Sequence, residues 1–257
     1  RPKTAAFKTT DMVGLDTMAH VAKNSYDSLP NDEEREAFKL PEWVNQMIEN
    51  GQLGDKSKQG FYKKQKTEEG TERYFWDYKG GEYKPSEKPK FESLKMAKMA
   101  KTTGESIKAV IQGEDKAAEF AWRNLRDTLL YSFNRIPEIA DDIVNVDNAM
   151  KWGFNWEIGP FEMFDAIGID YFVERAEKDG LNVPDKLKKI KQFYKVENGT
   201  QYYNDFLNDT FKEVPKKPEQ IDLNLLKQTK GVVDQNDNAS IIDMGDGVFC
   251  LEFHSPQ

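Results

Sequence analysis

Residues 159–177 read GPFEMFDAIGIDYFVERAE, and residues 5–23 read AAFKTTDMVGLDTMAHVAK. Both stretches place a phenylalanine, an aspartate, a glycine and a second aspartate at the same spacing. The matched pairs, all separated by one constant interval, are Phe7 and Phe161, Asp11 and Asp165, Gly14 and Gly168, and Asp16 and Asp170. A phrase stated twice in one chain indicates a duplicated structural unit.

The residue types in this phrase predict a corner between two helices. Pro160 presets φ at a helix start, and Gly168 can adopt the left-handed conformation that closes a helix. Two residues later, Asp170 is expected to cap the next helix with a carboxylate at its positive end. Gly14 and Asp16 predict the same corner in the first copy, so the sequence predicts two related helical lobes.

The similarity continues beyond the corner. A Leu-Pro step opens the predicted helix EWVNQMIENGQLG, and a Val-Pro step opens DKLKKIKQFYKVENG. An aromatic pair follows each helix, and we match Phe61-Tyr62 in the first lobe with Tyr202-Tyr203 in the second. Each lobe is therefore expected to end in the same way.

The two copies differ in what precedes them. The second lobe has front helices, AEFAWRNLRDTLLYSFNRIPEIADDI and DNAMKWG, whose counterparts in the first lobe would lie before residue 1. The chain starts at Arg1 and stops after VFCLEFHSPQ, which resembles a strand with no sheet to join. We therefore expect a piece of a longer polypeptide.

Two hairpins are predicted between and after the lobes. Aromatic alternation surrounds Gly80-Gly81 in ERYFWDYKGGEYKP, and SIIDMGDGVFCLEF turns at Gly245-Asp246-Gly247. The predicted fold class is mainly α, with two related helical lobes and a small β-hairpin insertion. The predicted domains are a truncated first lobe at 1–65, a β-hairpin and connector at 66–100, a second lobe at 101–211, a linker with one short helix at 212–238, and the first strands of a further domain at 239–257.

The bulk composition excludes several classes of protein. The 257 residues are 38% hydrophobic, with a net charge of −8 and an isoelectric point near 5.1, which argues against nucleic acid as a partner. No apolar run approaches the roughly 20 residues of a membrane span. The lone Cys250 cannot form a disulfide within the chain, which suits a reducing cytoplasm.

Few residues offer catalytic chemistry. Gly245-Asp246-Gly247 is the nearest match to a dinucleotide-binding glycine motif, but a predicted strand follows it where a helix is needed, so we interpret it as a hairpin turn. His20 is interpreted as structural, and His254 is expected to have no nearby acid that orients it. The sequence therefore predicts no catalytic, cofactor-binding or metal-ligating set.

Three other groups are weighed against structural alternatives. Asp141-Asp142 could serve acid–base work, but adjacent helical residues point apart, which favours a solvated face or a helix cap. A basic run, Lys186, Lys188, Lys189 and Lys191, could meet phosphates, and an exposed helix face is the preferred interpretation. Trp152 and Trp156 are expected to pack at the centre of their lobe.

Four stretches together resemble the L-3-hydroxyacyl-CoA dehydrogenases. They are RPKTAAFKTTDMVGLDTMAHVAK, LGDKSKQGFYKK, NRIPEIADDIVNVDNAMKWGFNWEIGPFEMFDAIG and GDGVFCLEFHS. More narrowly, they are similar to the long bacterial form that is fused to an enoyl-CoA hydratase. The resemblance assigns residues 1–210 to a duplicated helical C-terminal region with lobes like the C-terminal domain of 6-phosphogluconate dehydrogenase, and residues from 239 to the first hydratase strands.

The resemblance also carries site residues. The matching structural positions are Gly14, Asp16, Gly60, Phe61, Asn134, Arg135, Gly159, Pro160, Phe161, Asp165, Gly168 and Asp170. In the family, a substrate-facing asparagine belongs to an Asn-Arg pair of the first lobe. Asn134-Arg135 matches that pair in the second lobe, where it is expected to keep the architecture without the catalysis. Lys58 departs from the family, because a glycine is common at its position.

The family implies a function for the whole. Its members carry NAD and a His–Glu pair on a Rossmann domain, which nothing here matches, while the helical region closes over acyl-CoA. The first hypothesis is therefore a substrate-closing and packing region of an NAD-dependent L-3-hydroxyacyl-CoA dehydrogenase, not catalytic by itself. Its expected partners are the acyl-CoA substrate, the missing Rossmann domain and a further copy through exposed lobe surface, without nucleic acid or a membrane span.

Two alternatives stay open. One is a non-enzymatic helical interaction or dimerisation module without a small-molecule ligand. The other is an autonomous hydrolase, which would need two carboxylates converging in one pocket.

Overall fold

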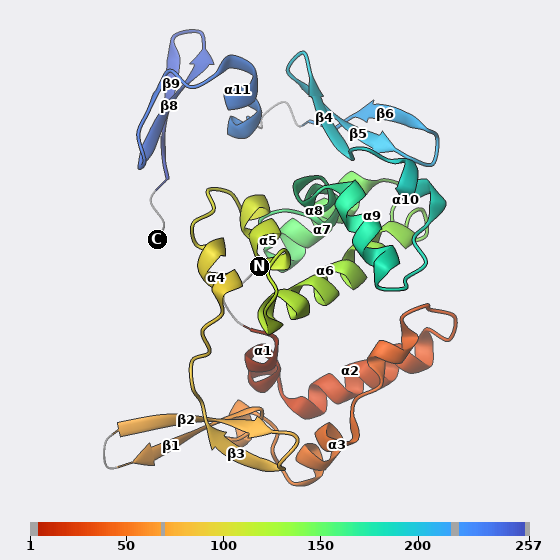
Figure 1. The fold of residues 1–257 in the computed structure, drawn as a ribbon, viewed down its shortest axis with the longest axis vertical. Coiled ribbons are helices and arrows are strands. Elements are labelled where there is room, and N and C mark those ends of the chain that lie inside the picture. Colours follow the sequence, from red (N-terminus) through yellow and green to blue (C-terminus); the bar gives the residue numbers. More distant parts are fainter. Residues whose placement is uncertain (1–4, 68–69, 217–220, 255–257) are drawn as a thin grey trace. The chain divides into compact units, whose positions relative to one another are not determined.

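The computed structural model describes residues 5–67, 70–216 and 221–254 (Figure 1). The chain divides into two compact units, residues 1–90 (unit 1) and residues 91–257 (unit 2). Each unit contains one copy of the repeated phrase. The finer domain boundaries predicted from the sequence stay predictions.

The helices of unit 1 surround a small core. They are α1 (Ala6–Val13), α2 (Leu15–Ser28), the 3₁₀ helix η1 (Arg35–Phe38), α3 (Glu42–Glu49) and the 3₁₀ helix η2 (Asp55–Ser57). Gly14 separates α1 from α2 with φ of 111°, a conformation that favours glycine. The buried core consists of Leu15, Val44, Met47 and Phe61.

An antiparallel sheet completes unit 1. Its strands are β1 (Tyr62–Thr67), β2 (Gly70–Asp77) and β3 (Glu82–Pro85), in the order β1-β2-β3. The predicted hairpin around Gly80-Gly81 is confirmed, since Asp77 pairs with Glu82 across it. Strand β1 was not predicted, because YKKQKT is polar and lacks the apolar alternation of a half-buried strand.

Unit 2 is built on a longer series of helices. They are α4 (Glu92–Ala97), α5 (Thr103–Ile111), α6 (Lys116–Asn134), α7 (Ile143–Phe154), α8 (Pro160–Ile167), α9 (Ile169–Lys178) and α10 (Asp185–Lys189). Side-chain caps fix three of the starts. Thr102 forms a capping box with Glu105, and Asp115 and Asp142 accept backbone N–H groups at the starts of α6 and α7.

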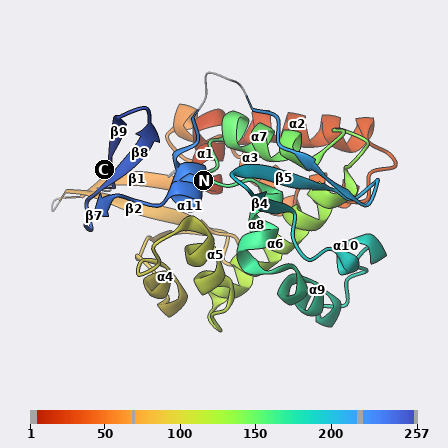
Figure 2. The ribbon, with the colours of Figure 1, turned by 90° about the horizontal axis from the view of Figure 1, so that it is seen from above.

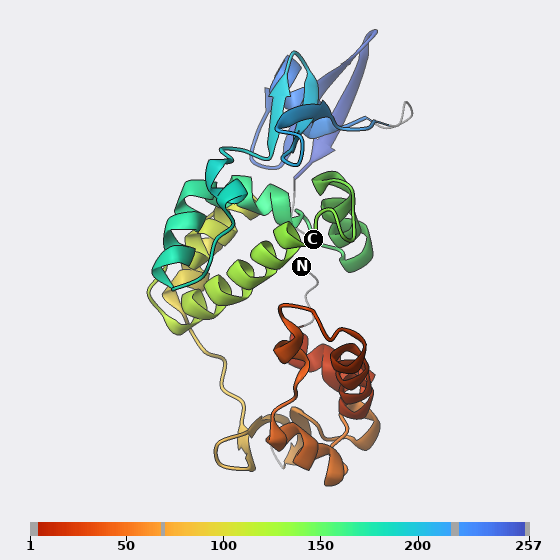
Figure 3. The ribbon, with the colours of Figure 1, turned by 90° about the vertical axis from the view of Figure 1, so that its right-hand side faces the viewer.

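Aromatic side chains fill the core of unit 2. Trp122, Phe161, Phe164, Phe172 and Phe193 are all at most 1% exposed. Figure 3 shows α6, in lime green, with the teal α9 near one of its ends. The Trp122 ring of α6 lies 5.6 Å from the Phe172 ring of α9. Burying one such ring stabilises a fold by about 1.5–3 kcal/mol, so this cluster dominates the packing of unit 2.

Two more antiparallel sheets follow the helices. The first contains β4 (Tyr194–Glu197), β5 (Thr200–Asp205) and β6 (Thr210–Glu213), and Figure 2 shows β4 and β5 from above. After α11 (Leu223–Lys230) comes the second, with β7 (Asp234–Gln235), β8 (Ala239–Gly245) and β9 (Val248–Phe253). The predicted short helix and the turn at 245–247 are confirmed.

The predicted fold class is wrong. About 47% of the described residues are helical and 20% lie in strands, and three three-stranded antiparallel sheets replace the single hairpin insertion. The stretch after Lys189 was predicted as helix, yet residues 194–197 form β4. Pairing with residues further along the chain decides these strands, and local composition does not reveal it. In the described part of the chain, none of the helices is both long and apolar enough to cross a membrane.

Candidate functional site

The aspartate of the repeated phrase joins helix to sheet in unit 1. Asp11 of α1 is 1% exposed. Its Oδ1 accepts a hydrogen bond from the Phe61 amide at 2.7 Å, and its Oδ2 accepts one from the Tyr62 amide at 2.9 Å. Burial raises the pKa of this carboxyl group. Gly60 lies so close to the carboxylate that a Cβ atom there would collide with it.

Unit 2 repeats this arrangement atom for atom. Asp165 accepts hydrogen bonds from the Phe193 and Tyr194 amides, both at 2.7 Å. The Phe161 and Phe193 rings meet edge to face at 5.0 Å and 73°. The corresponding rings of unit 1, Phe7 and Phe61, meet at 4.8 Å and 74°.

The counterpart of Phe61-Tyr62 is therefore Phe193-Tyr194, and the match to Tyr202-Tyr203 was wrong. Tyr203 lies on β5, where it pairs with Tyr194 across the sheet. The sequence favoured the later pair because it follows a glycine, but the aspartate contact identifies the equivalent residues. We call this arrangement of aspartate, aromatic pair and three-stranded sheet the aspartate corner.

The glycine of the phrase behaves as predicted, and the second aspartate does not. Gly168 has φ of 93° and is itself the N-cap residue of α9, so Asp170 lies in the first helical turn without capping it. Asp170 instead pairs with Lys191 at 2.8 Å. In unit 1 the same shift places Asp16 within the first turn of α2, beside Lys56 at 2.5 Å.

Unit 2 also contains a fully buried aspartate that the sequence did not single out. Asp147 of α7 is fully buried and accepts hydrogen bonds from the Phe161 amide at 2.8 Å and the Glu162 amide at 3.2 Å. The Tyr194 hydroxyl donates to the same carboxylate at 2.8 Å. Asp147 thus ties α7 to the start of α8 and to β4. A lone aspartate in VDNAMKWG gives no local signal of this role.

Burial dominates the electrostatics of this cluster. Desolvation raises the pKa of Asp147 to about 7 and that of Asp165 to about 6. Burial and the neighbouring Asp147 raise the pKa of the Tyr194 hydroxyl well above its usual range. The nearby Glu162 is held by Lys151 at 2.6 Å and by the Gly159 amide at 2.7 Å. Every carboxylate here has a positioning partner, which favours a structural role.

The remaining signature residues, and the departing Lys58, lie in both units. Gly159 is buried against Asp147, where a Cβ atom would collide with the carboxylate, and Pro160 opens α8. Asn134 ends α6, and Arg135 follows it and pairs with Glu138 at 2.8 Å. Lys58 takes the left-handed conformation with φ of 61°, which explains why glycine suits that position.

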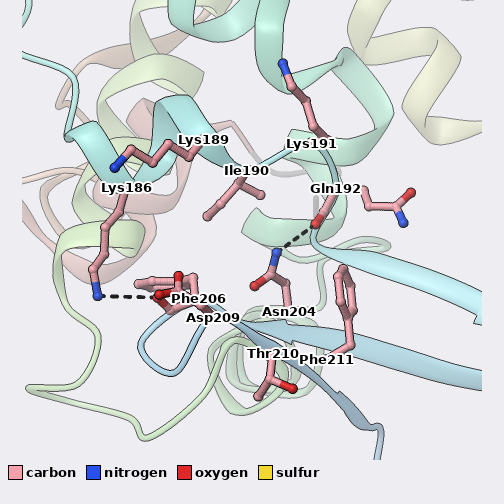
Figure 4. Close-up of a pocket in the computed structure, with 10 residues that line it drawn as sticks. All are labelled: Lys186, Lys189, Ile190, Lys191, Gln192, Asn204, Phe206, Asp209, Thr210 and Phe211. Carbon is pink, nitrogen blue, oxygen red and sulfur yellow. Dashed lines mark hydrogen bonds between the residues drawn. The ribbon is translucent and has the colours of Figure 1, made fainter.

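A pocket of about 440 Å³ lies beside the aspartate corner of unit 2 (Figure 4). Ile190 and Phe206 form its buried floor. Its rim includes Lys186, Lys189 and Lys191 of the predicted basic run. Lys186 donates to the Phe206 carbonyl at 3.3 Å, and Lys191 is engaged with Asp170. The run is exposed, as the preferred interpretation had it.

The expectation that His254 has no nearby acid to orient it is wrong, because Glu252 lies beside its ring. His254 Nε2 lies 2.9 Å from the Ser240 hydroxyl and 3.2 Å from the Glu252 carboxylate. Both partners face the same ring nitrogen. A hydrolase triad needs the serine and the acid on opposite nitrogens, so this group does not form one. His20 is exposed on α2.

The predictions for the Asp141-Asp142 pair and for the two tryptophans have different outcomes. Asp142 caps α7 through the Asn145 amide at 2.8 Å, which confirms the helix-cap interpretation. Trp152 is 77% exposed, so its predicted packing at the centre of the lobe is wrong, whereas Trp156 packs against the core. Within the described residues, no cluster of histidine, cysteine and acidic side chains could hold a metal ion.

Comparison with known proteins supports the resemblance. Residues 2–64 match the family described as 3-hydroxyacyl-CoA dehydrogenase, C-terminal domain. A "Probable 3-hydroxyacyl-CoA dehydrogenase" of Bacillus subtilis (strain 168) is 46% identical over 260 residues, which cover 99% of this chain. A protein of the same name in Deinococcus radiodurans is 43% identical over 74 residues, or 29% of this chain.

A more distant relative also aligns with most of the chain. A protein of Rickettsia prowazekii, provisionally named a fatty acid oxidation complex trifunctional enzyme, is 21% identical over 81% of this chain. The chain spans only 32% of the Bacillus protein, 20% of the Deinococcus protein and 28% of the Rickettsia protein. The family match and the names of the Bacillus and Deinococcus proteins agree with the resemblance found in the sequence.

Proposed function

We propose that this chain is the substrate-closing and packing region of an NAD-dependent L-3-hydroxyacyl-CoA dehydrogenase of fatty-acid β-oxidation. The observation that carries the proposal is the end-to-end similarity to the Bacillus subtilis relative, which covers 99% of this chain. The match of residues 2–64 to the C-terminal domain of that family supports the same assignment. The longer relatives favour a place within a larger polypeptide. We further propose a hydratase part from residue 239 onward, which rests on the resemblance of GDGVFCLEFHS alone.

The described residues do not fit NAD. A dinucleotide site needs a glycine-rich turn between a parallel strand and a helix, so that backbone N–H groups can approach the pyrophosphate. The paired strands of the described chain are antiparallel, and Gly245-Asp246-Gly247 connects β8 to β9. We therefore propose that NAD and the catalytic His–Glu pair lie on a Rossmann domain elsewhere in the polypeptide.

The chain's own part in the reaction is mechanical. The two aspartate corners hold the sheets β1-β2-β3 and β4-β5-β6 on their helices through charge-assisted hydrogen bonds, which are roughly twice as strong as neutral ones. Rigid corners of this kind suit elements that close over an acyl-CoA and exclude water. In this proposal Asn134-Arg135 preserves the architecture of α6 and takes no part in proton transfer. The proposed compartment is the cytoplasm.

The test is NADH oxidation with acetoacetyl-CoA. The 257-residue chain is assayed alone and beside the complete polypeptide that its gene encodes. We expect the complete polypeptide to oxidise NADH and the 257-residue chain to show no turnover. Turnover by the chain alone would contradict the proposed division of labour, because it would place catalytic groups within these residues.

The alternative is a helical interaction or dimerisation module without enzymatic context. The exposed apolar side chains of α1 favour this possibility, since Phe7 is 52% exposed and Val13 is 56% exposed. A complete polypeptide without dehydrogenase activity, together with self-association of the chain, would support the module.

A further inference from the structure

The lysines around α10 differ in whether a carboxylate balances their charge. Lys188 is paired with two carboxylates, the nearer at 2.8 Å, and Lys191 is paired with one, also at 2.8 Å. In the part of the chain that the structure describes, no ion pair engages Lys186 or Lys189. Lys186 donates a hydrogen bond to the neutral Phe206 carbonyl at 3.3 Å. Two positive charges of one short helix are therefore left without a partner of opposite charge.

These two lysines line the pocket of unit 2, and the balanced Lys188 does not. Figure 4 shows Lys186 and Lys189 on one side of the pocket, while the Lys191 side chain points away from the other labelled residues. Lysines three positions apart on a helix repel each other, which costs stability. Asp209 also lines the pocket, but the lysines outnumber it, so the lining is positive in a chain whose net charge is −8. A hollow with this charge attracts an anion.

The floor of the pocket suits a flat apolar ring. Ile190 is 6% exposed and Phe206 is 5% exposed, so the core holds both side chains in place. Phe206 stacks on Phe133 with ring centroids 4.5 Å apart and an interplanar angle of 17°, which fixes its orientation. Phe211 adds a half-buried aromatic ring to the lining. Because aromatic rings attract one another at centroid distances of about 4.5–7 Å, Phe211 offers a partner for a planar ligand.

One polar group in the lining is oriented for a ligand. Asn204 Nδ2 donates a hydrogen bond to the Gln192 carbonyl at 3.2 Å, as the dashed line in Figure 4 shows. Asn204 Oδ1 accepts no hydrogen bond from the described residues. A half-buried carbonyl oxygen held in this way can accept a hydrogen bond from an N–H or O–H group of a ligand.

We propose that this pocket binds a nucleotide. The phosphate lies against the ammonium groups of Lys186 and Lys189, the base packs on the aromatic and aliphatic lining, and an N–H or hydroxyl group donates to Asn204 Oδ1. The volume of about 440 Å³ falls within the range of about 300–1,000 Å³ that small-molecule sites occupy. None of these contacts depends on the proposed dehydrogenase activity, so either can fail alone.

Isothermal titration calorimetry of the 257-residue chain with adenosine 5′-monophosphate (AMP) tests the pocket. We expect saturable binding of one AMP per chain. Lys186→Met and Lys189→Met should each weaken binding about tenfold, because each removes a charge-assisted hydrogen bond to phosphate. Lys188→Met is the matched control, since it removes the same charge from the same helix outside the pocket, and it should leave the affinity unchanged. Circular dichroism shows whether each variant keeps its helices.

Two further titrations identify the part of the nucleotide that binds and its source. Inorganic phosphate should bind at least about tenfold more weakly than AMP, because it lacks the base that packs on the floor. Adenosine 3′,5′-bisphosphate represents the nucleotide end of CoA. Tighter binding of this compound than of AMP would identify CoA as the source of the nucleotide, and equal or weaker binding would identify a free nucleotide.

Three results would overturn the assignment of a nucleotide to this pocket. One is the absence of binding up to roughly 1 mM AMP. Another is binding that Lys186→Met and Lys189→Met leave unchanged, or that Lys188→Met weakens equally. The third is equal affinity for inorganic phosphate and AMP. Dehydrogenase activity of the complete polypeptide without AMP binding by the chain would leave the proposed function standing and reject only this nucleotide site.

Discussion

Replacing Asp147 by asparagine should make the stability of unit 2 much less dependent on pH between pH 5 and pH 8. The wild-type carboxyl group is fully buried, and desolvation raises its pKa from 3.8 to about 7. The folded state therefore holds the proton more tightly than the unfolded state. The stability that the protonated form contributes is complete below pH 3.8 and is lost as the pH rises through about 7.

The magnitude follows from the size of the shift. One pKa unit corresponds to about 1.4 kcal/mol, so a shift from 3.8 to about 7 amounts to about 4 kcal/mol in all. Between pH 5 and pH 8, about 2–3 kcal/mol of this stability is lost from the wild type. Asparagine cannot ionise, but its amide group faces the Glu162 N–H, which costs about 1–2 kcal/mol at every pH. D147N should therefore be the less stable protein at pH 5 and the equal or more stable one at pH 8.

Urea unfolding at both pH values, followed by hydrogen exchange of α6, measures the free energy of unfolding of unit 2. Asp142→Asn is the matched control, because it removes the same charge from the half-buried N-cap of the same helix, where asparagine caps equally well. The control should change the free energy by less than about 0.5 kcal/mol at both pH values. A loss for D147N that is identical at pH 5 and pH 8 would refute the reasoning, since the carboxylate would then be unperturbed by burial.

Other substitutions test the repeat and its tight turns. Phe161→Ala should lower the free energy of unfolding of unit 2 by about 3–5 kcal/mol, but Phe7→Ala should cost unit 1 only about 1 kcal/mol, because its ring is half exposed; equal losses in calorimetry would contradict the difference in cover. Gly60→Ala should destabilise unit 1 by about 2–3 kcal/mol in urea unfolding, because the added methyl group collides with Asp11. Lys58→Gly should raise the melting temperature of unit 1, since it relieves about 1 kcal/mol of left-handed strain, and an unchanged or lower temperature would show that no strain is present.

Local features of the sequence predicted the parts that depend on neighbouring residues. Gly14 and Gly168 close their helices with positive φ, as glycine permits and other residues resist. The turns at Gly80-Gly81 and Gly245-Asp246-Gly247 connect paired strands, because such turns are encoded by two or three residues. The repeated phrase could be recognised from the sequence, because the spacing of its residues along the chain does not depend on the fold.

Contacts between distant residues decided what local patterns could not show. Asp11 and Phe61 are 50 positions apart, and Asp147 reaches Tyr194 over 47 positions. The polar strand YKKQKT joins a sheet because β2 supplies its hydrogen bonds, so its composition carries no strand signal. This is why β1 and the sheet β4-β5-β6 were missed and the fold class was wrong.

The sequence by itself determined that one corner is built twice, with its glycines and aspartates at fixed spacing. Only the tertiary structure decided what the corner does: it showed that Asp11 and Asp165 hold strands by their backbone amides, and that Phe193-Tyr194 is the matching aromatic pair. It also showed that Phe7 and Phe161, which occupy the same position of the repeat, differ in burial, since Phe7 is exposed and Phe161 is buried. The physical reason is that burial and hydrogen bonding depend on which segments meet in space, whereas spacing along the chain records only the local backbone.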